Sequence, residues 1–146
     1  MLTTTAIAHL HRHQDALSVL IDQITALLAG DPEAARLPLA GVRWSIARKA
    51  REYQLFKHTE IFDPAIVRGR PAQAALAADL RRACLTVSGE YEAHIRRWAG
   101  RDTVIEWAAY RGDVVAMVSR LRRHLLVERQ QVERLLAGSE QVRCLA

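Results

Sequence analysis

The stretch that decides the fold is residues 107–136, which read WAAYRGDVVAMVSRLRRHLLVERQQVERLL. Apolar residues recur in it every three or four positions, and charged residues, mostly arginine, fill the positions between them. Because an α-helix turns once about every 3.6 residues, this spacing places the apolar side chains on one stripe of a long amphipathic helix. The stripe comprises Val114, Met117, Leu121, either His124 or Leu125, Glu128, Val132 and Leu135.

The N-terminal half contains two further stretches with this period. The first begins after the threonines at positions 3–5, which are good N-cap residues, and ends at Gly30. The second begins after Pro38 or Gly41 and ends at Phe62, because Pro64 disfavours helix at the residue before it. We expect residues 67–71 to form a loop. The apolar stripe of the first helix is interrupted at one position and comprises Ile7, Leu10, Leu17, Ile21, Ile24 and Leu28, with Gln14 in the gap.

A third helix is predicted over residues 71–99, with Pro71 in its first turn. The fourth, described above, is expected to be closed by Gly138. Four long helices with short connections pack most simply as an antiparallel up-down-up-down four-helix bundle. The sequence therefore predicts an all-α fold, with a bundle over residues 1–138 and a C-terminal tail over residues 139–146.

Composition agrees with a helical domain. The chain has 146 residues, of which 50% are hydrophobic and only 5% aromatic, a balance that favours helices over strands. Its formal charge is +5, and every basic residue except Lys49 and Lys57 is arginine or histidine. The arginines alternate with acidic residues along nearly every segment, which is typical of solvated helix faces and argues against nucleic-acid binding.

The cysteines and the N-terminus indicate the compartment. Cys84 and Cys144 are the only cysteines and form no disulfide framework, so a reducing environment is expected. No long apolar run occurs near the N-terminus, so we expect neither a signal peptide nor a membrane span. The sequence predicts a cytoplasmic protein.

The informative residues are polar side chains on the inner stripes. Gln14, Lys57, His124 and Glu128 occupy or border positions that require apolar side chains, and His11 lies one turn before Gln14. A polar group buried there costs free energy unless it is paired or bound to a metal. We therefore expect these side chains to contact one another inside the bundle.

His124 and Glu128 are four residues apart and project from the same face of one helix. An imidazole nitrogen and a carboxylate oxygen in this arrangement suit two ligands of one cation. The same spacing also fits a hydrogen-bonded structural pair. His9 and His13 are two residues away from His11 on either side, so they point elsewhere and are expected to be exposed.

Three stretches together resemble the hemerythrin-like family, also called the HHE cation-binding domain. They are HRHQDAL at residues 11–17, the segment from Arg43-Trp44 to KHTEIFDP at residues 57–64, and HLLVE at residues 124–128. The similarity spans the chain from the first helix to Leu136 and depends on the order and spacing of short motifs. It implies a four-helix bundle with a non-haem, usually di-iron, site of histidines and carboxylates.

The resemblance also implies individual roles. The family's metal ligands on the first and fourth helices correspond to His11, His124 and Glu128. On the second helix, where the family has a histidine and then a glutamate, this chain has Tyr53 and Lys57. The histidine of the third helix corresponds to Cys84. Tyr53 and Cys84 are therefore additional candidate ligands, but an ammonium group cannot ligate a metal while it is charged.

These substitutions lead to the main functional hypothesis. Lys57, with Gln14 beside it, would be the buried partner that balances Glu128 in place of a metal, so no cofactor is expected. The chain would then be a small non-catalytic binding or regulatory module that acts through a protein partner or as a homo-oligomer. The alternative is a non-haem iron protein that binds dioxygen or nitric oxide, or that stores or senses iron. We expect no enzyme, because no catalytic motif is recognisable.

Overall fold

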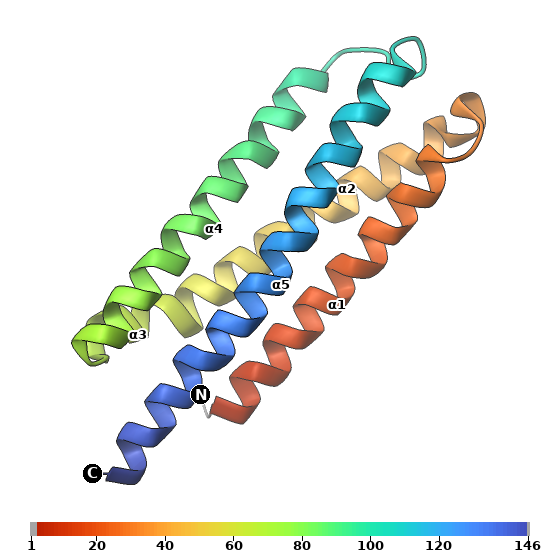
Figure 1. The fold of residues 1–146 in the computed structure, drawn as a ribbon. Coiled ribbons are helices and arrows are strands. Elements are labelled where there is room, and N and C mark those ends of the chain that lie inside the picture. The colour runs from red at the N-terminus through yellow and green to blue at the C-terminus, as the bar shows by residue number, and fades with distance from the viewer. Residues whose placement is uncertain (1–2, 146) are drawn as a thin grey trace.

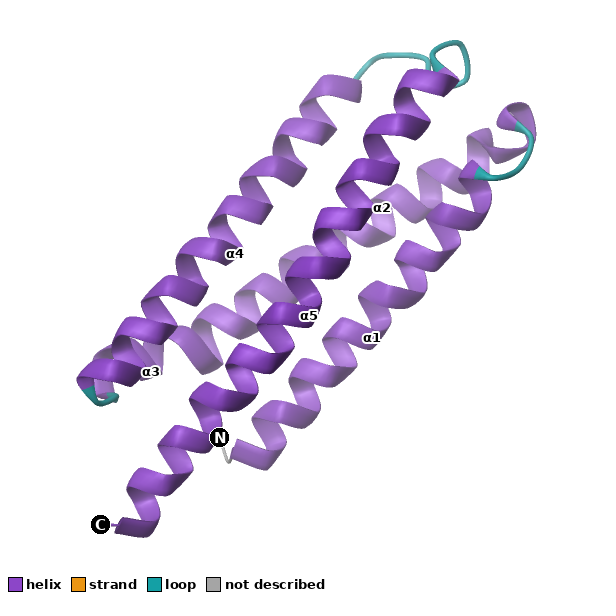
Figure 2. Cartoon of the chain, in the orientation of Figure 1, coloured by secondary structure: helices purple, strands orange, loops and turns teal. Residues whose placement is uncertain are grey.

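The computed structural model describes the backbone of residues 3–145 and the side chains of residues 3–138. Helices make up almost all of the described chain, which contains no strand (Figure 2). The predicted all-α class is therefore confirmed. The side chains of the tail expected at residues 139–146, including that of Cys144, lie outside the described part.

In chain order the elements are α1 (Thr3–Leu28), α2 (Pro32–Phe56), the π-helix η1 (Lys57–Phe62), α3 (Asp63–Arg68), α4 (Pro71–Trp98) and α5 (Trp107–Leu145). The four long helices, α1, α2, α4 and α5, lie side by side (Figure 1). The α1–α2 turn and the α4–α5 loop lie at one end of the molecule, and α3 lies at the other end (Figure 1).

The second helix begins earlier than the sequence predicted, at Pro32 rather than after Pro38 or Gly41. Asp31 is its N-cap, and its Oδ2 accepts a hydrogen bond of 2.9 Å from the backbone N–H of Ala34. Pro32 occupies the first turn, where a missing N–H has no cost. Pro38 lies inside the helix, where its ring removes one backbone hydrogen bond without ending the helix.

The predicted end of this helix at Phe62 is also wrong. The chain passes from α2 through η1 into α3, and only residues 69–70 separate α3 from α4. At the end of η1 the backbone N–H of Asp63 donates to the carbonyl of His58, five residues back. This wider turn places Pro64 in the first turn of α3, where its lack of an N–H is tolerated.

Gly138 does not end the last helix, because α5 continues to Leu145. A Cβ atom at Gly138 would lie 2.7 Å from Nε2 of Gln73 on α4. The glycine therefore leaves room for the end of the Gln73 side chain, and it is not a C-cap.

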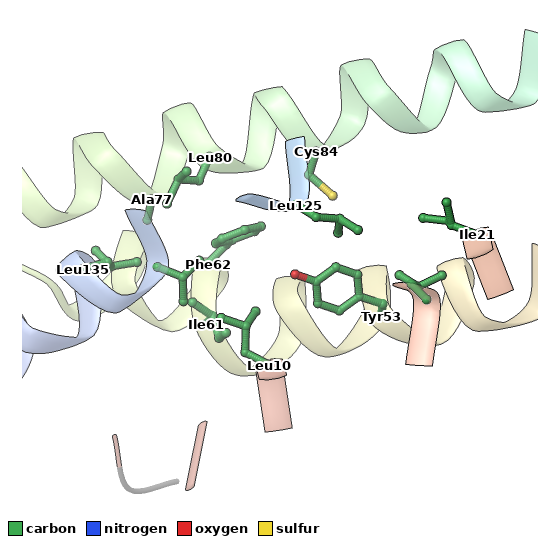
Figure 3. Packing of buried hydrophobic residues seen from close by; sticks show 12 residues of the cluster. Leu10, Ile21, Tyr53, Ile61, Phe62, Ala77, Leu80, Cys84, Leu125 and Leu135 are labelled. Carbon is green, nitrogen blue, oxygen red and sulfur yellow. The ribbon is translucent and has the colours of Figure 1, made fainter. Parts of the chain in front are cut away.

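The hydrophobic core consists of two clusters. One surrounds Tyr53 and Cys84 (Figure 3), and the other lies around Trp98 and Tyr110 toward the α1–α2 turn. Helix α1 packs on α2 and α5, and α5 packs on α4. Helix α4 packs mainly on η1, α3 and α5, and it meets α2 toward the C-terminal end of α2, where the Ser88 hydroxyl donates to the Gln54 side-chain oxygen at 3.0 Å. From there α2 and α4 separate toward the α1–α2 turn (Figure 1).

The core makes a first prediction. Phe62, the last residue of η1, is fully buried, so Phe62→Ala should lower the free energy of unfolding by about 3–5 kcal/mol. Leu55 on α2 is 67% exposed, and Leu55→Ala should change it by less than about 0.5 kcal/mol. Urea unfolding followed by circular dichroism measures both. Equal effects of the two substitutions would contradict the packing described for η1.

Candidate functional site

An ion pair lies at the centre of the bundle. Nζ of Lys57, the first residue of η1, donates to both carboxylate oxygens of Glu128 on α5, at 3.0 Å to Oε1 and 2.9 Å to Oε2. Lys57 is 3% exposed and Glu128 is 2% exposed. Two opposite charges are therefore held almost entirely out of water, in direct contact.

Residues of two further helices extend the hydrogen-bond network around this pair. The hydroxyl of Tyr53 on α2 donates to Oε1 of Glu128 at 2.6 Å. Nε2 of Gln14 on α1 donates to the Tyr53 hydroxyl and to the carbonyl of Leu125, both at 2.9 Å. The Lys57 ammonium also lies 4.1 Å from the centre of the Tyr53 ring, where the π-electrons attract a cation.

The last two members are Cys84 on α4 and His124 on α5. Nζ of Lys57 lies 3.2 Å from the Cys84 sulfur, and Nε2 of His124 lies 3.2 Å from Oε2 of Glu128. Each of the four long helices thus contributes at least one group. We call these residues the central cluster: Gln14, Tyr53, Lys57, Cys84, His124 and Glu128.

Burial and charge set the protonation of the cluster. Burial raises the pKa of Glu128, but contacts with His124, Lys57 and Tyr53 outweigh it and lower that pKa to about 2. Burial raises the pKa of Tyr53 far above its ordinary range, and the Glu128 carboxylate raises it further. Burial also raises the pKa of the Cys84 thiol, which the Lys57 ammonium only partly offsets. Glu128 is therefore a carboxylate beside a neutral phenol and a neutral thiol.

The histidines of α1 that the sequence singled out, His11 and His13, lie outside the central cluster. Nε2 of His11 lies 2.8 Å from Oε1 of Glu133, and both side chains are about 40% exposed. The structure thus places His11 against a different carboxylate from Glu128. His13, which the sequence analysis expected to be exposed, is half-buried and stacks on Phe56 with ring centres 4.9 Å apart.

A metal does not fit the residues that meet here. Among the side chains of residues 3–138, no three histidines, cysteines, aspartates or glutamates come together in a way that holds a metal ion. Cys84 and Glu128 both contact the Lys57 ammonium, which cannot act as a ligand. The site therefore offers neither the ligand number nor the charge that a pair of bridged irons requires.

A second polar group was missed by the sequence analysis. Asp113 on α5 lies 2.7 Å from Nδ1 of His94, accepts a 2.8 Å hydrogen bond from Nε1 of Trp98 and pairs with Arg97 at 2.7 Å. These contacts outweigh the effect of burial and lower the pKa of Asp113 to about 2. No local spacing indicates Asp113, because all its partners are on α4. The group links α4 to α5.

Comparison with known proteins adds no relative. No protein-family model, no curated protein and no solved structure matches this chain. Within the described residues, none of the helices is both long enough and apolar enough to cross a lipid bilayer.

The ion pair predicts strong coupling between its two members. Lys57→Met or Glu128→Gln alone leaves one buried charge without its partner and should destabilise the protein by about 3–5 kcal/mol. The double variant should lose clearly less than the sum of the two. The exposed pair Arg122–Asp22, at 2.7 Å, is the matched control, and its coupling should stay below about 1 kcal/mol. Double-mutant cycles by urea unfolding measure the coupling energy of each pair. Equal coupling in the two pairs would contradict a buried, partnered Lys57–Glu128 ion pair.

The lowered pKa of Glu128 predicts loss of stability in acid. An unfolded Glu128 binds a proton near its ordinary pKa of 4.5, whereas the folded one does so only near 2. Protons therefore favour the unfolded state between these pH values, and the free energy of unfolding should fall as the pH drops through that interval. Glu128→Gln removes the one proton that Glu128 takes up on unfolding, so the free energy of unfolding should fall less steeply with pH. The remaining slope includes Asp113, whose pKa is also lowered. Urea unfolding from pH 5.5 to 2.5 tests it, and identical slopes would contradict it.

Proposed function

We propose that this protein is a non-catalytic binding or regulatory module built on a hemerythrin-like, antiparallel up-down-up-down four-helix bundle, with Lys57 in place of the metal. The observation that carries the proposal is the contact of the Lys57 ammonium with both oxygens of Glu128. In the family that the sequence resembles, a cation neutralises such a carboxylate. Here a cation of the chain itself is in that position.

The surrounding contacts support this replacement. By the sequence resemblance, Tyr53 and Cys84 correspond to histidine ligands of the family, and both contact the ion pair, Tyr53 through Glu128 and Cys84 through Lys57. His124 retains its place beside Glu128. A metal at this position would have to displace the ammonium, and leaving that charge buried without its carboxylate would be strongly unfavourable.

The protonation and burial of the cluster support binding rather than catalysis. Its thiol is 5% exposed and has a raised pKa, so it is a poor nucleophile. Its carboxylate is held by hydrogen bonds on both oxygens and has a pKa near 2, so it is a weak base at neutral pH. The cluster therefore stabilises the bundle, and the module acts through its other surfaces, on a partner or a ligand.

Metal content tests the proposal. Protein purified without an affinity tag, from cells supplied with iron, should contain far less than one iron per chain by elemental analysis. Lys57→Glu should raise iron uptake, because it restores a carboxylate beside Glu128 and removes the competing cation. Lys49→Glu makes the same charge change on the only other lysine, which pairs at the surface with Glu52, and should leave iron uptake unchanged.

Either of two results would overturn the proposal. One is stoichiometric iron in the unaltered protein, with a visible absorption band between oxygen ligands and ferric iron; this would establish the alternative, a non-haem iron protein. The other is equal iron uptake by Lys57→Glu and Lys49→Glu.

A further inference from the structure

A cleft of about 420 Å³ lies between α2 and α4, in the half of the bundle where these helices separate. Side chains of α1 and α5 also line it. Trp44 on α2 belongs to the lining and is 73% exposed, so the cleft opens to solvent. Its volume falls in the range of sites that hold small organic molecules.

The lining is apolar apart from a few groups. Ile46, Ile95 and Leu121 are typical of it, and the lining contains no aspartate or glutamate. Its one permanently charged member is Arg43, which is half-buried. Tyr91 lies in the same lining, and burial raises the pKa of its hydroxyl to about 12, although the Arg43 charge opposes the rise. Tyr91 is therefore a neutral hydrogen-bond donor near a cation.

Arg43 has no ionic partner within the described chain, because no carboxylate of residues 3–138 forms an ion pair with it. Its guanidinium instead lies 5.5 Å from the centre of the Tyr110 ring. The hydroxyl of that tyrosine is buried without a hydrogen-bond partner. The Arg43 guanidinium therefore borders an apolar cavity and lies near neutral hydroxyl groups, but no carboxylate of the described residues balances its charge.

We propose that this cleft binds a small amphipathic monocarboxylate, such as a medium-chain fatty acid, with its carboxylate on Arg43 and its apolar body in the cleft. A guanidinium and a carboxylate match in shape and pair through two parallel hydrogen bonds. One arginine balances one negative charge, which favours a monocarboxylate over a phosphate. The absence of acidic side chains in the lining disfavours an amine.

The experiment is isothermal titration calorimetry of the full chain with decanoate below its micelle concentration, and with decanol and decylammonium as probes of the same tail. Decanoate should bind saturably at one site and more tightly than either of the others. Arg43→Gln should weaken decanoate binding at least about tenfold and leave decanol binding unchanged. Arg43→Lys keeps the charge and should retain more affinity than Arg43→Gln.

Two further variants test whether decanoate binds in the cleft itself or responds only to the net charge of the protein. Arg48→Gln removes the same charge from an exposed position on α2 and should bind decanoate normally. Ala47 lines the cleft, so Ala47→Phe should fill it and weaken decanoate and decanol alike. Thermal unfolding of each variant confirms that it is folded. The assignment is overturned if decanoate does not bind saturably, if Arg43→Gln and Arg48→Gln behave alike, or if Ala47→Phe has no effect.

This inference rests on the proposed binding role and names its ligand class, but its test does not involve Lys57. If decanoate does not bind and the iron content is low, the ligand assigned to the cleft is wrong and the proposal of a metal-free module stands. If decanoate binds and the protein contains stoichiometric iron, the proposal of a metal-free module is wrong and the cleft assignment stands.

Discussion

The interior of this bundle depends on one ion pair. Moving a lysine and a glutamate from water into a protein core costs several kcal/mol per ion after relaxation, and the attraction between them recovers this only when the geometry is good and the other polar atoms are satisfied. Both conditions are met here, because the Lys57 ammonium contacts both oxygens of Glu128. Tyr53 and His124 also contact Glu128, and the Cys84 sulfur contacts Lys57. These contacts come from α2, η1, α4 and α5, so the pair depends on how these elements pack against one another.

The π-helix η1 begins at Lys57, the cation of this ion pair. Tyr53 and Lys57 face the interior four residues apart, as they would in any α-helix. The extra residue in the π-turn then rotates the following chain by about 100° relative to an uninterrupted α-helix. The consecutive residues Ile61 and Phe62 are both buried as a result, while Asp63 is exposed. The wide turn thus lets Ile61 and Phe62 fill the core next to the buried cation, and it lets the chain continue as a helix beyond Pro64.

These elements show what the sequence could predict and what it could not. Helical period identifies which residues face inward, so Gln14, Lys57 and Glu128 stood out as polar groups on apolar stripes, and the structure places all three in the interior. Period does not resolve neighbouring positions in a stripe. It left His124 and Leu125 as alternatives, and the structure buries Leu125 while His124 lies at the edge of the core.

Features that depend on several helices were beyond the sequence. The π-turn has no local signature, since Pro64 alone indicates an end to the helix. The pairing of His11 with Glu133 depends on how α1 and α5 are aligned along their axes. The cleft depends on the separation of α2 from α4, a distance that no stripe encodes, because a stripe shows the direction of a side chain and not how far away the facing helix lies.

The two halves of the interior therefore differ in what their polar groups can do. In the central cluster the ammonium, the carboxylate and the Tyr53 hydroxyl already contact one another, so a ligand there would have to break bonds that stabilise the fold. A cavity of only about 70 Å³ borders the cluster, which is room for a few water molecules. Arg43 lines a larger space and has no carboxylate partner among the described residues. Charges that balance one another, as in the central cluster, have little to gain from a ligand. An anion bound between the separated ends of α2 and α4 would instead balance the charge of Arg43.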